Sequence, residues 1–121
     1  MTQSDFGKAL IAEEEFPDIV ESTDIIRDKL RVVLVDESFI DFWWSAEIKD
    51  RFACHWERSH IDGKTFRHNN MPHSQWKSVG TFPQHFHDGD SGAVVESFLA
   101  IEPEGAVREF LEYARNKLRR S

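Results

Sequence analysis

The residues of this chain that could carry out chemistry are its six histidines, which all lie within the thirty-three residues from 55 to 87. An imidazole can transfer protons near neutral pH, ligate a metal or form hydrogen bonds inside a core. Pro72 and Pro83 fix the backbone angles of two histidine segments, and neighbouring aromatic side chains can anchor these segments. We therefore expect the imidazoles to be held in a defined geometry. The histidines are His55, His60, His68, His73, His85 and His87.

The first interpretation of these histidines is cleavage of an RNA phosphodiester without a metal or another cofactor. One histidine acts as general base on the 2′-hydroxyl and a second as general acid, while Arg67 and Lys77 stabilise the charge that develops on the phosphate. Trp56 or Trp76 stacks on a base. The predicted catalytic residues are His55, Arg67, His73, His85 and His87, and the predicted substrate-binding residues are Trp56, Asn70, Trp76 and Lys77.

Two other interpretations make the protein a non-enzymatic binding module. In one, His85 and His87 bind a divalent metal together with His73 or His55, because alternate residues of an extended segment point to the same side. The chain has a single cysteine, Cys54, so no set of thiolates supports a zinc site. In the other, the histidines are structural and attach a long loop to the sheet through hydrogen bonds to the backbone.

The charge of the chain is unevenly distributed. A formal net charge of −7 argues against nucleic-acid binding, because nucleic-acid-binding proteins neutralise phosphates with Lys and Arg. Residues 51–87 nevertheless hold five basic and two acidic groups, a net charge of +3, as well as all the histidines. Any contact with RNA is therefore expected within this segment. The chain shows neither a signal-peptide pattern nor a membrane-length apolar run, so we expect a cytoplasmic protein.

The pattern of apolar residues predicts an α+β fold. It consists of an antiparallel β-meander of four to five strands, a C-terminal amphipathic helix packed on one face, and a long His-rich loop. The whole chain, 1–121, is expected to form a single domain. Its expected parts are a weakly ordered segment or short helix over 1–16, the meander over 17–68, the His-rich loop over 69–92 and the C-terminal helix over 103–118.

The strand predicted over residues 51–58 orients the first histidine. Alternate residues of a strand point to opposite faces of the sheet. The two predicted sets are Phe52, Cys54 and Trp56 on the apolar face, and Ala53, His55 and Glu57 on the other. Asp62-Gly63 predicts a hairpin turn after this strand, so the segment 64–68 is expected to return antiparallel beside it.

Three motifs of the chain resemble the TumE-type family of small bacterial and archaeal proteins, which are described as the toxin half of toxin–antitoxin pairs. In that family a His-Trp pair at a strand end is followed by Arg-Tyr-Asp-Asn-Ala-Pro-His, by Phe-Pro-His-His-Lys-His and by a C-terminal helix. The matching stretches here are His55-Trp56, residues 67–73 and residues 82–87. The resemblance covers about residues 30–118, which is most of the chain.

The resemblance implies the toxin of a type II toxin–antitoxin system that acts on RNA or on the translation machinery, with an antitoxin as partner and a homodimer as a further expectation. The chain departs from the family pattern at several positions. Glu37 stands where glycine is usual, and Asn69 replaces an aspartate. The family positions that carry over are His55, Trp56, Arg67, Asn70, Pro72, His73, Phe82, Pro83, His85 and His87.

Overall fold

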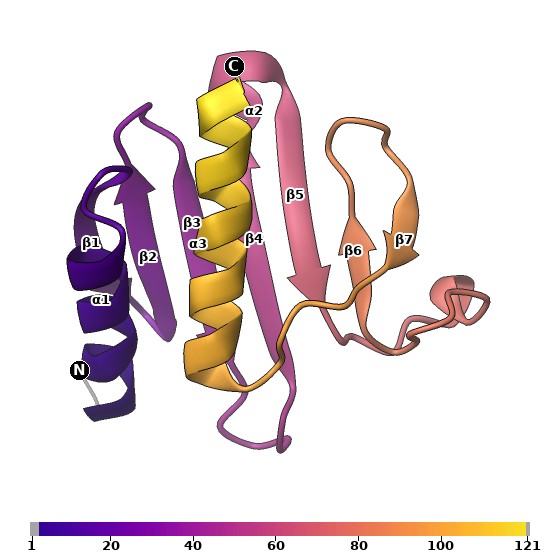
Figure 1. Ribbon diagram of the computed structural model, residues 1–121. Coiled ribbons are helices and arrows are strands. Elements are labelled where there is room, and N and C mark those ends of the chain that lie inside the picture. Colours follow the sequence, from indigo (N-terminus) through magenta and orange to yellow (C-terminus); the bar gives the residue numbers. More distant parts are fainter. Residues whose placement is uncertain (1–2, 121) are drawn as a thin grey trace.

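The sheet is a seven-stranded antiparallel meander in which every strand pairs with its neighbours in chain order, as the computed structural model in Figure 1 shows for residues 3–120. Its strands are β1 (Val20–Ile26), β2 (Lys29–Leu34), β3 (Phe39–Trp44), β4 (Phe52–Arg58), β5 (Lys64–Asn69), β6 (His85–His87) and β7 (Val94–Glu96). The helices are α1 (Gln3–Glu15), the single turn α2 (Ser59–Asp62), the 3-10 turn η1 (Ser74–Trp76) and α3 (Pro103–Arg120).

The predicted α+β class and the C-terminal helix are confirmed, but the predicted number of strands is too low. The segment 69–92, which was expected to be a loop, contains η1 and β6, and β7 follows it. Each of these two strands has three residues, which is too short for an alternation of apolar and polar side chains to be recognised. Pairing with β5 therefore makes β6 a strand, rather than any preference of its own residues.

Both long helices pack on the same face of the sheet (Figure 1). Helix α3 turns one apolar stripe toward the strands, and its Phe110 ring meets Phe42 of β3 edge to face at a centroid distance of 6.0 Å. Each fully buried Leu or Phe side chain contributes about 2 kcal/mol to the free energy of unfolding. The buried residues of the stripe are Ala106, Val107, Phe110, Leu111 and Ala114.

The strands divide their side chains between this helix-covered face and the opposite face, which we call the open face. On β2 and β4 every second residue is buried against the helices, and the residues between them are exposed or half-buried. The predicted division of β4 is confirmed, because Phe52, Cys54 and Trp56 lie in the core. His55 therefore lies on the open face, as expected.

The buried face also contains a histidine, His68 of β5. Its ring stacks on Phe110 at a centroid distance of 6.4 Å, and its Nδ1 lies 2.7 Å from the Ser97 hydroxyl. Burial in this apolar surrounding lowers the pKa of His68 to about 4. The imidazole is therefore neutral at pH 7, and it accepts a hydrogen bond from Ser97.

This burial predicts an acid-sensitive fold. The unfolded chain takes up a proton on His68 below about pH 6.5, whereas the folded chain does so only near pH 4. The free energy of unfolding should be constant above pH 6.5 and should fall by about 3 kcal/mol between pH 6.5 and 4 through this one group. Urea unfolding at several pH values measures the slope. His68→Gln should reduce the slope and the exposed His60→Gln should not; a slope unchanged in His68→Gln would contradict this assignment.

The turn between β2 and β3 has a strained residue, Glu37, at the position where the resemblance implies glycine. Glu37 adopts a φ of +75°, in the left-handed region that costs a residue with a Cβ atom about 1 kcal/mol or more. The Asp36 carboxylate accepts hydrogen bonds from the backbone N–H and the hydroxyl of Ser38, at 3.1 and 2.6 Å, and holds the turn in this form. The hydroxyl of Ser38 in turn accepts the indole N–H of Trp56 at 2.9 Å.

We expect Glu37→Gly to raise the free energy of unfolding by about 1 kcal/mol, because glycine adopts a positive φ without a steric penalty. Thermal unfolding followed by circular dichroism measures the change. The matched control is Glu37→Ala, which removes the same carboxylate but keeps the Cβ atom and should give no such gain. Equal effects of the two variants would show that the side chain, and not the backbone angle, determines the result.

Candidate functional site

One polar residue from each of six neighbouring strands lies in a single row across the open face. Residues directly opposite each other in antiparallel strands point to the same face and lie side by side. The register therefore brings together three of the predicted catalytic residues, which are His55, Arg67 and His87. We call the whole set the polar row: Asp24, Arg31, Asp41, His55, Arg67 and His87.

Arg67 lies between two grooves of the open face. The first groove, of about 420 Å³, extends from β2 to β5 and is lined by His55 and Arg67 among others. The second groove, of about 290 Å³, is lined by Arg67 and His87 together with residues of the β6–β7 turn. Each groove thus contains one histidine of the polar row, and the exposed Arg67 belongs to both.

The environment of His87 favours the neutral form of its ring. Half-burial is the largest cause that lowers the pKa of His87 to about 4, followed by electrostatic contributions from His85, Arg67 and His73 in that order. The Trp76 and His87 rings meet at right angles at a centroid distance of 5.4 Å. His87 is therefore an unprotonated imidazole at pH 7, which can accept a proton.

His55 has a carboxylate partner two residues further along the same strand. Its Nε2 lies 3.2 Å from Oε1 of Glu57. The hydroxyl and the backbone N–H of Ser59 donate to the other oxygen of this carboxylate, and these bonds lower the pKa of Glu57 to about 2. Glu57 is therefore an anion that can hold a proton-bearing Nε2 of His55 and leave Nδ1 to exchange a proton.

The loop between β5 and β6 carries the other predicted site residues. His73 directly precedes η1 and is exposed, Trp76 ends η1 against His87, and Lys77 follows with an exposed side chain. His85 lies on β6 beneath this loop, is 1% exposed and has its Nδ1 2.8 Å from the Pro83 carbonyl oxygen. The ring of His85 is thus covered, and it contacts the His87 ring at a centroid distance of 5.0 Å; its predicted catalytic role stays a prediction.

Two predicted substrate-binding residues are structural. Trp56 is 1% exposed and faces the helices, so it cannot stack on a base. Asn70 uses both ends of its side-chain amide within the fold, since its oxygen accepts from Phe52 N at 3.0 Å and its nitrogen donates to Asp50 O at 2.7 Å. The predicted surface role of Trp56 conflicts with its place on the apolar side of β4.

The structure adds residues to the site that the sequence analysis did not select. Lys29, Arg31, Asp41 and Glu57 line the first groove beside His55. A signal existed only for Glu57, which shares a strand face with His55 two residues away. The other three lie on β2 and β3, and only the register of the sheet brings them beside β4.

The alternative interpretation, a divalent metal held by His73, His85 and His87, is not supported by this geometry. Within the described part of the chain, no group of three or more His, Cys, Asp or Glu side chains is arranged to hold a metal ion. Nδ1 of His85 lies within hydrogen-bond distance of the Pro83 carbonyl oxygen.

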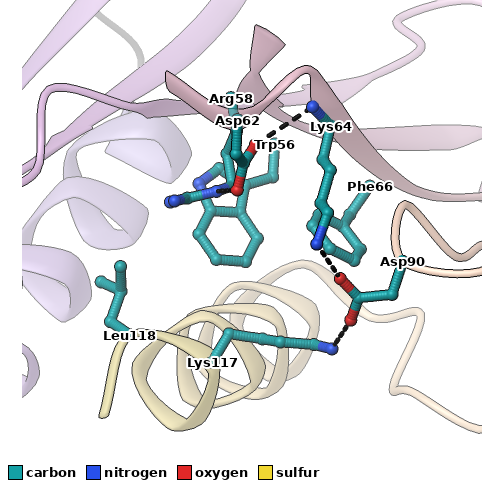
Figure 2. A pocket seen from close by; sticks show the side chains of 8 residues that line it. All are labelled: Trp56, Arg58, Asp62, Lys64, Phe66, Asp90, Lys117 and Leu118. Carbon is teal, nitrogen blue, oxygen red and sulfur yellow. Dashed lines mark hydrogen bonds and ion pairs between the residues drawn. The ribbon is translucent and has the colours of Figure 1, made fainter. Parts of the chain in front are cut away.

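A further hollow of about 100 Å³ lies on the helix side, between the end of α3 and β5 (Figure 2). Lys64 and Lys117 both approach the Asp90 carboxylate, and Arg58 is paired with Asp62 at 3.0 Å. The cations of this hollow are thus engaged with carboxylates that the fold itself supplies. Its ion pairs attach the end of α3 to β5 and to the β6–β7 turn.

Comparison with known protein families identifies the chain. The profile of a family described as Toxin TumE matches residues 8–118, which is nearly the whole chain. The chain belongs to the TumE toxin family. Comparisons with curated proteins and with solved structures gave no match. In residues 3–120 of this TumE family member, no helix has both the length and the apolar composition needed to cross a membrane.

Family membership confirms the resemblance drawn from the three motifs. The structure shows why the motifs occur together in this order. The first motif lies within β4, the second begins on β5 with Arg67, and the third ends on β6 with His87. Each of the three consecutive strands thus delivers one residue of the polar row.

The arrangement predicts how His87 titrates. In an NMR titration its imidazole should show a pKa near 4. Arg67→Gln should raise this pKa, because the variant removes a positive charge from the strand directly opposite. Arg120→Gln, which removes a charge from the exposed end of α3, should leave it unchanged. An unchanged titration in Arg67→Gln would contradict the close approach of these two side chains.

Proposed function

We propose that this TumE family member is the toxin of a toxin–antitoxin pair and cleaves RNA by histidine acid–base catalysis on the open face of its sheet. The observation that supports the proposal is the placement of His55 and His87 on opposite sides of the exposed Arg67. A cation between two imidazoles matches the groups that this reaction requires, because charge develops on the phosphate while one proton is taken and another is given.

The spacing suits a single phosphate. Neighbouring strands lie about 4.8 Å apart, so the backbones of His55 and His87 are about 10 Å apart with Arg67 between them. A phosphate that accepts hydrogen bonds from the Arg67 guanidinium therefore has an imidazole on each side. The two grooves leave room for the nucleosides before and after it.

The lowered pKa of His87 assigns it the role of the base, which leaves the role of the acid to His55 beside the Glu57 carboxylate. His87 is neutral at pH 7 and takes the proton of the 2′-hydroxyl, whose oxygen then forms a bond to phosphorus. The bond from phosphorus to the 5′-oxygen breaks as protonated His55 gives its proton to that oxygen. Arg67 stabilises the negative charge of the phosphorane throughout. The products are a 2′,3′-cyclic phosphate and a 5′-hydroxyl, and no metal is needed.

Neighbouring residues support the two histidines. Glu57 holds the His55 ring through Nε2, in the way that a carboxylate orients a catalytic imidazole. Trp76 covers one side of His87 and presents a half-buried indole ring beside the second groove, where a base can stack. His73 and Lys77 are exposed on the same loop and can approach the backbone of a bound strand.

Cleavage of a short RNA by the purified protein, free of antitoxin, tests the proposal. His55→Ala and His87→Ala should each lower kcat by about 10²- to 10⁴-fold, which is the usual contribution of a general acid or base. Activity should rise with pH through about 4 as His87 loses its proton. Activity should persist in EDTA, and an RNA with deoxyribose at the cleaved position should remain intact.

The control variant is His60→Ala, because His60 is exposed and its Nε2 lies 2.8 Å from the Glu37 carbonyl oxygen, outside the polar row. It should cleave like the wild type. Intact RNA at every pH from 5 to 8, with toxicity in cells unchanged by His87→Ala, would contradict the proposal. That result would favour a non-enzymatic module that binds its antitoxin.

A further inference from the structure

The first groove carries more cationic groups than its own carboxylates can neutralise. Its lining includes three positive side chains, Lys29, Arg31 and Arg67, and two negative ones, Asp41 and Glu57. The groove is therefore positive before His55 takes up a proton, although the chain as a whole carries a formal charge of −7.

Both carboxylates of the groove are engaged within the protein. Asp41 accepts two hydrogen bonds from Arg31, at 2.8 and 2.9 Å, one on each oxygen. Glu57 is held by Ser59 on one oxygen and by His55 on the other. In the part of the chain that the structure describes, these contacts leave the groove with two exposed cations that have no carboxylate partner, Lys29 and Arg67.

Lys29 is too far from Arg67 to act on the same phosphate. It begins β2, three strands away from β5, which corresponds to about 14 Å across the sheet. Both residues point to the open face, because Lys29 alternates with the buried Leu30 and shares its face with Arg31. The two cations therefore mark the two ends of one groove, with His55 close to the Arg67 end.

We propose that Lys29 binds a backbone phosphate of a single-stranded RNA lying along the first groove, on the 3′ side of the cleaved bond. This subsite rests on the proposed function. In the proposed reaction, His55 gives its proton to the departing 5′-oxygen, and His55 lies in the first groove. The strand that begins with this oxygen therefore continues past His55 toward β2, which places the subsite on the 3′ side. Lys29 thus selects substrates that extend beyond the 3′ nucleotide.

Three RNAs with the same cleavage site test this subsite: a dinucleotide, the same dinucleotide extended by three nucleotides on its 3′ side, and one extended equally on its 5′ side. Lys29→Ala should raise KM about three- to tenfold for the 3′-extended RNA only, with kcat unchanged. The dinucleotide and the 5′-extended RNA should behave as with the wild type. Arg120→Ala is the matched control, since it removes one positive charge from the end of α3 and should change none of the three.

A binding measurement separates this inference from the proposed reaction. Versions of the three RNAs with deoxyribose at the cleaved position bind without being cut, and fluorescence anisotropy gives their affinities at several salt concentrations. Lys29→Ala should reduce the slope of log K against log salt by about 0.7 for the 3′-extended RNA, which corresponds to one phosphate contact on a single strand.

Each outcome of these measurements either supports or overturns the Lys29 subsite. Loss of affinity confined to the 3′-extended RNA supports the subsite, even if the wild type cuts no RNA and the proposed reaction fails. An equal effect of Lys29→Ala on all three RNAs, or on the 5′-extended RNA alone, overturns it. The subsite is also overturned if Lys29→Ala binds the 3′-extended RNA as tightly as the wild type does, or if the wild type binds none of the three RNAs. In each of these cases, cleavage of the dinucleotide by the wild type would still support the proposed reaction.

Discussion

The register of strands β4, β5 and β6 is the constraint on which the site depends. Because side chains alternate between the two faces of a strand, a shift of one residue would move His55 or Arg67 into the core and bring its apolar neighbours to the surface. The core residues Cys54, Phe66 and Phe86 are buried on the other side of the same strands and oppose such a shift. The energy that packs α3 on the sheet therefore also aligns the polar row.

Burial gives the two histidines of the polar row different environments. The loop that carries η1 packs Trp76 against His87, and this half-burial makes the neutral ring the stable form at pH 7. His55 lies two strands away beside an anionic carboxylate. Two imidazoles of the same chemical type thus have different surroundings, and the proposed division into acid and base rests on this difference.

The acidic character of the chain does not extend to the first groove. The carboxylates that line this groove, Asp41 and Glu57, are each held by hydrogen bonds from neighbouring residues. Many of the other carboxylates form surface ion pairs elsewhere, such as Glu15 with Arg108 and Asp18 with Arg115 between the α1 region and α3. A net charge is thus a poor guide to the potential of one groove, because short-range pairing decides which charges remain available to a ligand.

The sequence alone determined the elements with long or strongly periodic patterns, the side of β4 on which His55 lies, and the family. Strand alternation and helical spacing are local properties, so they can be recognised from neighbouring residues. The pairing partner of each residue, the covering of His85, the structural role of Asn70 and the contribution of Lys29 and Asp41 were decided only by the tertiary structure. These features depend on contacts between residues far apart in the chain, and β6 became a strand because β5 offered its backbone for pairing.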